Sequence, residues 1–434
     1  MKNFRSEIKR KVTGTFSLNI IGMVLSFLVS VLIARQLGPE GYGEYSYVIT
    51  WLFILNLPAT MGLKSLIVRD IASNQSKQDW GSISGLLAWS NKTVLATSTA
   101  IALIFGAITV ALYFIGERDG QLLPTIFISL FLLPVIALTT LRQAAMQGFH
   151  YVVLGQICDS FIQPISFVAL LTFSYLFLPD VISARWVMLF KLISCSIALL
   201  IGAFMLYRVI PHEVKVAKSE FQVNSWLRSS FFLLLLTGSS TIFNQSDRLM
   251  LGMLDGVESV GIYTIASRGV QYVLLAQVIG SSVLGPSISS LYTQRKIEEL
   301  QKITTKSARL IGLSSLIVSL MLIIFGKQFL SIFGESFIQG YTVLVILCAG
   351  KVINAFSGLV GLLLNMTNHE KDTAFVNISC AFTNVALNYY LIPLYGAEGA
   401  AFSTSLTVAI CNIWLVYLVY KRIGIHSTAL GKIG

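Results

Sequence analysis

The chain has 434 residues, of which 55% are hydrophobic and only 12% are charged, whereas a soluble domain carries about 25% charged residues. Together with a mean hydropathy of +0.76, this composition excludes a soluble globular protein and predicts an integral membrane protein. The net charge of +11 does not indicate nucleic-acid binding, because the basic residues are distributed as a membrane topology requires.

Apolar runs long enough to cross a bilayer, about 20 residues each, follow one another along the whole chain. The first, at 12–34, has no charged residue and is too long for the h-region of a cleaved signal peptide, so we expect it to be a retained helix. The sequence therefore predicts an all-α integral membrane protein with twelve transmembrane helices. They are expected at 12–34, 44–63, 84–115, 122–146, 151–178, 184–207, 229–253, 259–292, 308–326, 338–367, 372–393 and 398–420.

The connection between the first two spans has a degenerate copy 218 positions further along the chain. An offset near half the chain length predicts two similar halves in tandem, as in many secondary transporters. We expect an N-terminal six-helix lobe at 1–210, a cytoplasmic linker at 211–228 and a C-terminal six-helix lobe at 229–434. The connections are either duplicated gate loops or two ordinary turns. The matched pairs are Gly38 with Gly256, Glu40 with Glu258, Gly43 with Gly261, and Tyr45 with Tyr263.

Lysine and arginine divide unequally between the two sides of the predicted membrane. The side that holds the N-terminus carries 22 of them, the opposite side carries 4 and the spans carry 5, which accounts for all 31. Acidic residues in the connections divide 9 and 9. This asymmetry follows the positive-inside rule and predicts that both termini are cytoplasmic. The four basic residues of the outer side are Arg35, Arg118, Arg185 and Lys327.

Ionisable residues at membrane depth are costly, so each is a candidate for function unless it is paired structurally. Arg248, Arg268 and Lys351 are the leading candidates for binding an anionic substrate, and Arg142 is a further one at the cytoplasmic end of its span. The alternative is that these residues form buried ion pairs that lock helices together. The acidic candidates for charge balance or ion coupling are Asp247 and Asp159.

The first outer connection contains the candidate gate residues. We expect Arg35 to pair with Glu44 across this turn. Gly38 and Gly43, together with the repeat copy Gly261, are expected to shape the turn itself.

The sequence contains no nucleophile elbow, no phosphate-binding loop and no pair of histidines at metal-ligand spacing. We therefore predict a protein without enzymatic activity, metal or cofactor. Without an ATP site, transport would be driven by an ion gradient or by the substrate gradient itself. The five cysteines all lie within predicted spans, as small apolar side chains do.

Three segments of the chain carry a family resemblance: Ala34–Tyr45, Asp247–Ala266 and Leu387–Ala401. They resemble the bacterial polysaccharide biosynthesis transporters, the Wzx-type oligosaccharide flippases of the multidrug/oligosaccharidyl-lipid/polysaccharide (MATE-like) exporter superfamily. The resemblance covers essentially the whole chain. It implies two lobes around a central cavity that opens alternately to each side, with the lipid tail left in the bilayer. It also implies that basic cavity residues bind pyrophosphate or acidic sugars, and Arg248, Arg268 and Lys351 are the positions that correspond.

The expected function is to flip an undecaprenyl-diphosphate-linked oligosaccharide to the outer leaflet of a bacterial inner membrane, for O-antigen, capsule or exopolysaccharide synthesis. The expected partners are this lipid-linked substrate, membrane lipids, H⁺ or Na⁺ and the polysaccharide polymerase machinery. Nucleic acid is not expected. Two alternatives remain open: an ion-coupled efflux transporter for small molecules, and a non-transporting scaffold for envelope assembly. The cationic interior favours an anionic substrate over an organic cation.

Overall fold

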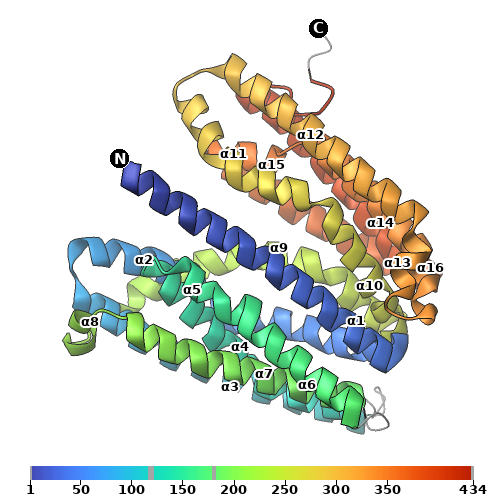
Figure 1. Cartoon of the computed structure of the whole chain (residues 1–434), viewed down its shortest axis with the longest axis horizontal. Coiled ribbons are helices and arrows are strands. Elements are labelled where there is room, and N and C mark those ends of the chain that lie inside the picture. The colour runs from blue at the N-terminus through green and yellow to red at the C-terminus, as the bar shows by residue number, and fades with distance from the viewer. Residues whose placement is uncertain (1, 116–121, 178–181, 432–434) are drawn as a thin grey trace. The chain divides into compact units, whose positions relative to one another are not determined.

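The computed structural model describes residues 2–115, 122–177 and 182–431. Arg118, one of the predicted outer basic residues, lies outside the described residues. Within them the chain is helical and contains no strand (Figure 1). It divides into two compact units, one comprising residues 1–37 and 44–241, the other residues 38–43 and 242–434. The division lies inside a helix, and the domain boundaries drawn from the sequence stay a prediction.

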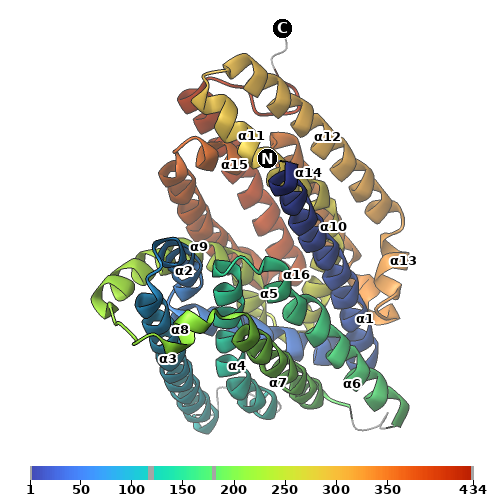
Figure 2. The ribbon, with the colours of Figure 1, turned by 60° about the vertical axis from the view of Figure 1, so that its left-hand side comes forward.

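In the first unit, α4 (Leu123–Gly148) is the central helix. It packs against α2, α3, α5 and α7, and Figure 2 shows α3, α4 and α7 side by side. The other elements of this unit are most of α1 (Lys2–Thr60), α2 (Leu63–Lys77), α3 (Trp80–Phe114), α5 (Val152–Ile157), the π-helix η1 (Cys158–Ile162), α6 (Gln163–Phe177), α7 (Ala184–Val209), α8 (His212–Val216) and the first part of α9 (Val223–Leu254).

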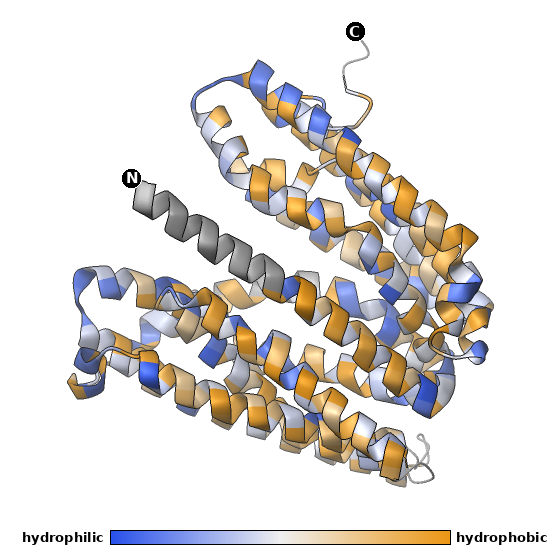
Figure 3. Cartoon of the chain, in the orientation of Figure 1, coloured by the Kyte–Doolittle hydropathy of each residue, from blue (hydrophilic) through white to orange (hydrophobic). Residues whose placement is uncertain are grey.

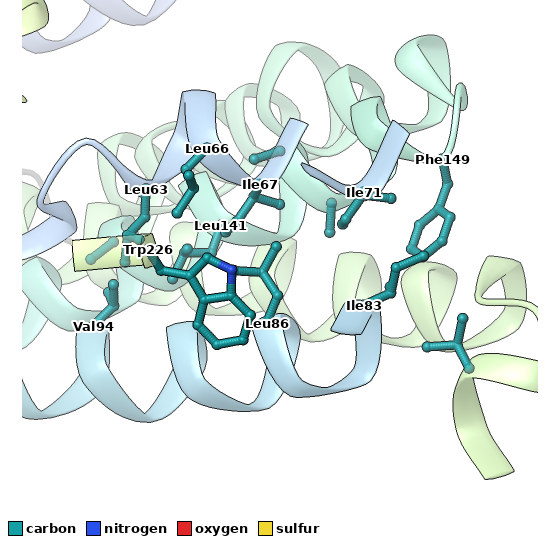
Figure 4. Packing of buried hydrophobic residues seen from close by; sticks show 14 residues of the cluster. Leu63, Leu66, Ile67, Ile71, Ile83, Leu86, Val94, Leu141, Phe149 and Trp226 are labelled. Atoms are coloured by element: carbon teal, nitrogen blue, oxygen red, sulfur yellow. The ribbon is translucent and has the colours of Figure 1, made fainter. Parts of the chain in front are cut away.

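The core of this unit gathers around the amphipathic helix α2. Four of its apolar residues recur at a spacing that places them on one face of a helix, and these four are fully buried. Figure 4 shows these side chains facing Leu86 of α3, Leu141 of α4 and the indole of Trp226 on α9. Asp79 accepts a hydrogen bond from the backbone amide of Ser82, and this bond lowers the pKa of the Asp79 carboxyl. The α2 residues are Leu63, Leu66, Ile67 and Ile71.

In the second unit, α14 (Tyr341–Ser357) packs against α10, α12 and α16. The segment that follows α16 turns back along α12, where the side chain of Gln301 and the backbone of His426 exchange two hydrogen bonds of 2.7 Å. The other elements are the end of α9, α10 (Val257–Val273), α11 (Leu275–Thr293), α12 (Ile297–Ile324), α13 (Gly326–Ser331), the 3₁₀-helix η3 (Glu335–Gly340), α15 (Val360–Met366) and α16 (Glu370–Ile423).

Eight helices of the described residues are long and apolar enough to cross a membrane, or nine if the bent pair α10–α11 counts as one span. Apolar residues cover most of their lengths, while polar residues gather at ends such as the turn between α11 and α12 (Figure 3). Two of the eight, Leu18–Thr60 and Glu370–Ile423, have 43 and 54 residues, about twice the length that one bilayer requires. α9 is not among the eight. The predicted count of twelve spans stays a prediction.

The predicted connections at 35–43 and 394–397 are not loops. In each place the helix continues on both sides of a single glycine, Gly38 (φ 66°, ψ −174°) in α1 and Gly396 (φ 54°, ψ −132°) in α16. Gly256, the repeat partner of Gly38, has nearly the same conformation (φ 100°, ψ 171°) immediately before α10. This backbone region is open essentially only to glycine. One residue without a side chain therefore replaces the expected turn.

One further expectation needs correction. The predicted span at 259–292 is two helices, α10 and α11, which meet at Leu274 with a bend of 46°. The charged stretch before the predicted span at 308–326 mostly forms the first turns of the long helix α12. No break separates these charged turns from the apolar part of α12, because residues 297–324 contain no proline or glycine other than Gly312, which lies inside the helix.

Residues 38–43 pack within the second unit against the start of α10. A Cβ on Gly43 would overlap the carbonyl oxygen of Val257, and a Cβ on Gly261 would overlap that of Pro39. The offset of 218 residues places Pro39 on Val257 and Gly43 on Gly261, so the two overlaps are equivalent contacts of a symmetric helix crossing. Small residues allow backbones to approach this closely. The crossing is consistent with a tandem duplication of the chain.

Candidate functional site

A buried carboxylate, Asp247, is the centre of a polar cluster within the second unit. Its side chain comes from α9 and is only 6% exposed. One carboxylate oxygen accepts hydrogen bonds from the hydroxyls of Tyr263 on α10 and Thr404 on α16, both at 2.5 Å. The other accepts a hydrogen bond of 2.8 Å from the amide of Asn388 on α16. Asp247 therefore ties together three helices.

Asn384 extends the cluster one helical turn along α16. Its amide oxygen accepts hydrogen bonds from Ser246 at 2.8 Å and from Asn388 at 3.2 Å, and its amide nitrogen donates to Thr404 at 3.2 Å. Buried polar groups in an apolar helix require such partners. The network fixes the side chains around Asp247 in one arrangement.

The sequence analysis singled out Asp247 but missed its partners. Asn384 and Asn388 are four residues apart in an otherwise apolar stretch of α16, and this spacing places both on one face of a helix. That spacing could have indicated a polar cluster from the sequence. No sequence pattern indicated Tyr263 and Thr404, because an isolated hydroxyl in an apolar segment most often bonds to its own helix.

The two candidate arginines lie close to Asp247 without pairing to it directly. Arg248 donates to the side-chain oxygens of Gln245 at 3.3 Å and Ser267 at 3.1 Å, and among the described residues it forms no ion pair with Asp247. Its charge interacts with those of Arg268 and Asp247. The structure places Arg248 near both Arg268 and Asp247, while the assignment of these residues to substrate binding and charge balance stays a prediction.

Lys351, on α14, faces a cavity of about 280 Å³ within the second unit. Amide side chains from α11, α14 and α16 share the wall, and Gln277 donates to Asn354 at 3.5 Å. In the part of the chain that the structure describes, the Lys351 ammonium has no hydrogen-bond partner, and its charge interacts with that of Asp247. A lysine beside amides in an otherwise apolar cavity favours an anionic or hydroxyl-rich ligand. The other polar lining residues are Ser281, Asn377 and Asn412.

Arg142 and Asp159 belong to a different site, in the first unit. Arg142, on α4, is 4% exposed and forms an ion pair of 3.2 Å with Asp159 in the π-helix. The guanidinium packs directly against Gly202 on α7, where a Cβ would overlap it. The burial and the ion pair favour a structural role for Arg142, while its assignment to substrate stays a prediction. The ion pair with Arg142 is consistent with the charge-balance role predicted for Asp159.

Replacing one partner of this ion pair is expected to destabilise the protein more than replacing both partners. Asp159→Asn should lower the free energy of unfolding by about 2 kcal/mol, because it leaves the Arg142 charge buried; the cost lies below that of a fully buried pair, since the Asp159 side chain is 31% exposed. Arg142→Met combined with Asp159→Asn should recover most of the loss. The thermal midpoints of the purified variants measure both effects, and Asp70→Asn at the exposed Arg69 pair is the control. A double variant less stable than Asp159→Asn would contradict the argument.

The structure describes the surroundings of the predicted gate residues. Gly38 is the non-helical residue within α1, and Gly43 and Gly261 lie at the close crossing between α1 and α10. Arg35 is exposed, and Glu44 accepts a hydrogen bond of 2.5 Å from Thr125 on α4. Pairing of Arg35 with Glu44 stays a prediction.

Comparison with known proteins identifies the family. Residues 8–292 match the family model described as "Polysaccharide biosynthesis protein". The chain belongs to this family. Residues 235–390 also match the MatE model. The polysaccharide biosynthesis match includes α9 and α10, and with them Asp247, Arg248 and Arg268.

Two curated relatives are similar in sequence. The chain is 22% identical over 431 residues to a protein of Shigella flexneri named "Putative O-antigen transporter", with 94% of this chain and 98% of the relative covered. It is 27% identical over 231 residues to "Probable flippase AglR" of Haloferax volcanii, with 52% of this chain covered, and it spans about half, 48%, of the length of that relative.

Two solved structures share the fold at low sequence identity. A multidrug resistance MATE family transporter in an inward-facing conformation matches with a TM-score of 0.79 and 14% identity, covering 93% of this chain and 94% of that one. The lipid II flippase MurJ in an inward closed conformation matches with a TM-score of 0.73 and 16% identity, covering 96% and 89%. Because both identities are low, these matches establish the fold alone.

Proposed function

We propose that this member of the polysaccharide biosynthesis family is a flippase that moves an undecaprenyl-diphosphate-linked oligosaccharide from the cytoplasmic to the outer leaflet. The single observation that carries the proposal is the buried carboxylate of Asp247 within the second unit, whose charge interacts with those of Arg248 and Lys351, while Arg248 also interacts with Arg268. An excess of positive charge at membrane depth suits a substrate whose diphosphate is anionic. The names of the relatives agree with this substrate class.

In this proposal the protein works by alternating access. Two six-helix lobes, at 1–210 and 229–434, are joined by a cytoplasmic linker at 211–228 and enclose a central cavity. The protein lies in the bacterial inner membrane with both termini in the cytoplasm, as the distribution of basic residues requires, and it catalyses no reaction. Asp247 is the group on which H⁺ or Na⁺ acts, because its buried carboxylate interacts with the charges of Arg248 and Lys351.

The direct test is a flipping assay with the purified full chain in liposomes. An undecaprenyl-diphosphate-linked glycan with a labelled sugar is placed in both leaflets, and an impermeant enzyme modifies the exposed fraction. The proposal expects the protected half to become accessible only in vesicles that contain the protein. Folded protein that leaves the protected half unchanged would favour the scaffold alternative, and movement of an organic cation in its place would favour the efflux alternative.

The basic residues should respond differently to conservative changes. Arg268→Lys is expected to slow flipping about tenfold although the charge remains, because the guanidinium binds phosphate through two parallel hydrogen bonds and an ammonium does not. Lys351→Arg should slow flipping less, because an ammonium acts on the anion as a point charge and requires no fixed geometry. Flipping rates at equal reconstitution measure both, with Lys371→Arg as the control at an exposed lysine. Normal rates for Gln variants of Arg248, Arg268 and Lys351 would refute the assignment.

A further inference from the structure

A second charged cavity lies at the start of α12, apart from the site described above. Its volume is about 530 Å³, and it is bounded by α12 and by Gly431 in the segment that follows α16. Lys302, Lys306 and Arg309 line it, followed by Leu310 and Leu313. Positions 302, 306, 309 and 313 are spaced four, three and four apart, which places them along one face of a helix.

The side chains at positions 302, 306, 309 and 313 form a stripe that changes from charged to apolar along the axis of α12. At 1.5 Å per residue it spans about 16 Å between Lys302 and Leu313. Lys302 and Lys306 form no ion pair within the described residues. Leu310 and Leu313 are 63% and 54% exposed. In Figure 3 polar residues colour the first turns of α12 and apolar residues predominate further along. A ligand that fits the stripe has a negative head and an apolar tail.

Arg309 is held in position by the segment after α16. Its Nε donates to the carbonyl oxygen of Ala429 at 2.9 Å, and Ala429 is itself bonded through its amide to the carbonyl oxygen of Phe356. The guanidinium reaches the wall of the cavity beside Gly431, where a Cβ would lie 3.6 Å from its Nη2 atom. A guanidinium fixed in this way presents its remaining N–H groups to an anion without further ordering.

We propose that this cavity binds the phosphate head group of an anionic phospholipid from the leaflet that surrounds the start of α12, with the acyl chain along Leu310 and Leu313. Basic residues near an anionic membrane surface each strengthen binding about fivefold. The proposal is independent of the transported substrate, because the cavity shares no lining residue with the Lys351 cavity.

The test measures thermal unfolding of the purified full chain in detergent with added dioleoylphosphatidylglycerol. The anionic lipid should raise the thermal midpoint in a saturable manner, whereas dioleoylphosphatidylcholine and inorganic phosphate should not. Lys302→Gln combined with Lys306→Gln should weaken the apparent lipid affinity about thirtyfold. The matched control removes the same charge at two exposed lysines outside the cavity, Lys296→Gln with Lys371→Gln, and should leave the affinity unchanged.

Leu313→Ser tests the acyl part of the site and should also weaken binding of the lipid. Equal midpoints of all variants without lipid would show that the changes leave the fold intact, and native mass spectrometry of the bound lipid replaces the midpoint for any variant that is less stable. The proposal fails if the two double variants lose affinity equally or if the zwitterionic lipid binds as well. A shift produced by inorganic phosphate alone would also overturn it.

Discussion

Asp247→Asn is expected to abolish glycan flipping while the protein stays in the membrane. Asparagine preserves the volume of the side chain, and its single oxygen still accepts hydrogen bonds from Tyr263 and Thr404. The negative charge that interacts with Arg248 and Lys351 is lost, and an excess positive charge at membrane depth costs several kcal/mol. We expect a flipping rate at least about a hundredfold lower, measured in liposomes at equal protein content.

Asp247→Ala should differ from Asp247→Asn in abundance. It leaves the hydroxyls of Tyr263 and Thr404 buried without their acceptor, at about 1–3 kcal/mol each, and removes one of the two acceptors of the Asn388 amide, so folded protein should decrease as well. Glu298→Gln at an exposed acid is the control. Normal flipping by Asp247→Asn would show that the carboxylate serves only to pack the helices, and loss of that variant from the membrane would indicate the same.

Gly43→Val and Gly261→Val are expected to produce the second large effect. Each added side chain would overlap a backbone carbonyl, of Val257 and of Pro39 respectively, and backbone cannot rotate away as the end of a side chain can. The helices at the crossing would have to separate. We expect a loss of more than about 3 kcal/mol of stability, as for severe overpacking, and no flipping. Gly→Ala at either position should show the same effect in weaker form.

The control for the crossing is Gly285→Ala. Gly285 is a buried helical glycine, and its added Cβ would meet only the ends of the side chains of Leu362 and Met366, at 3.8 and 3.9 Å. This change should be neutral or slightly stabilising, because alanine favours the helix by about 1 kcal/mol. Thermal midpoints and flipping rates of the variants are compared side by side. Tolerance of Val at both Gly43 and Gly261 would refute the close crossing.

The sequence predicted the class of fold and most helices because a bilayer imposes a simple rule. Each span requires about 20 apolar residues, and charged residues between such runs can be read directly from the sequence. The offset of 218 residues also identified Gly256 as the counterpart of Gly38, and the two share one unusual backbone conformation. It could not show that Gly38 and Gly396 interrupt continuous helices, since a glycine in a short connection also predicts a turn.

The candidate site was predicted in part for a similar reason. The cost of burying charge selects Asp247, Arg248, Arg268 and Lys351 from the sequence alone. It gives no information on partners, which depend on how the helices pack. Arg142 illustrates this limit: its position at the end of a span suggested contact with substrate, whereas the fold buries it beside Asp159 and against Gly202.

The sequence by itself thus determined that the chain is a helical membrane protein, and it predicted two related halves and a cationic interior, because hydropathy, charge and repeats are properties of the residues in order. The tertiary structure alone decided which polar groups meet. Tyr263, Asn388 and Thr404 converge on Asp247 from positions 16 to 157 residues away, and Gly431 lies beside Arg309 in the wall of one cavity. These contacts arise because helices far apart in the sequence pack together, and no local sequence pattern indicates such packing.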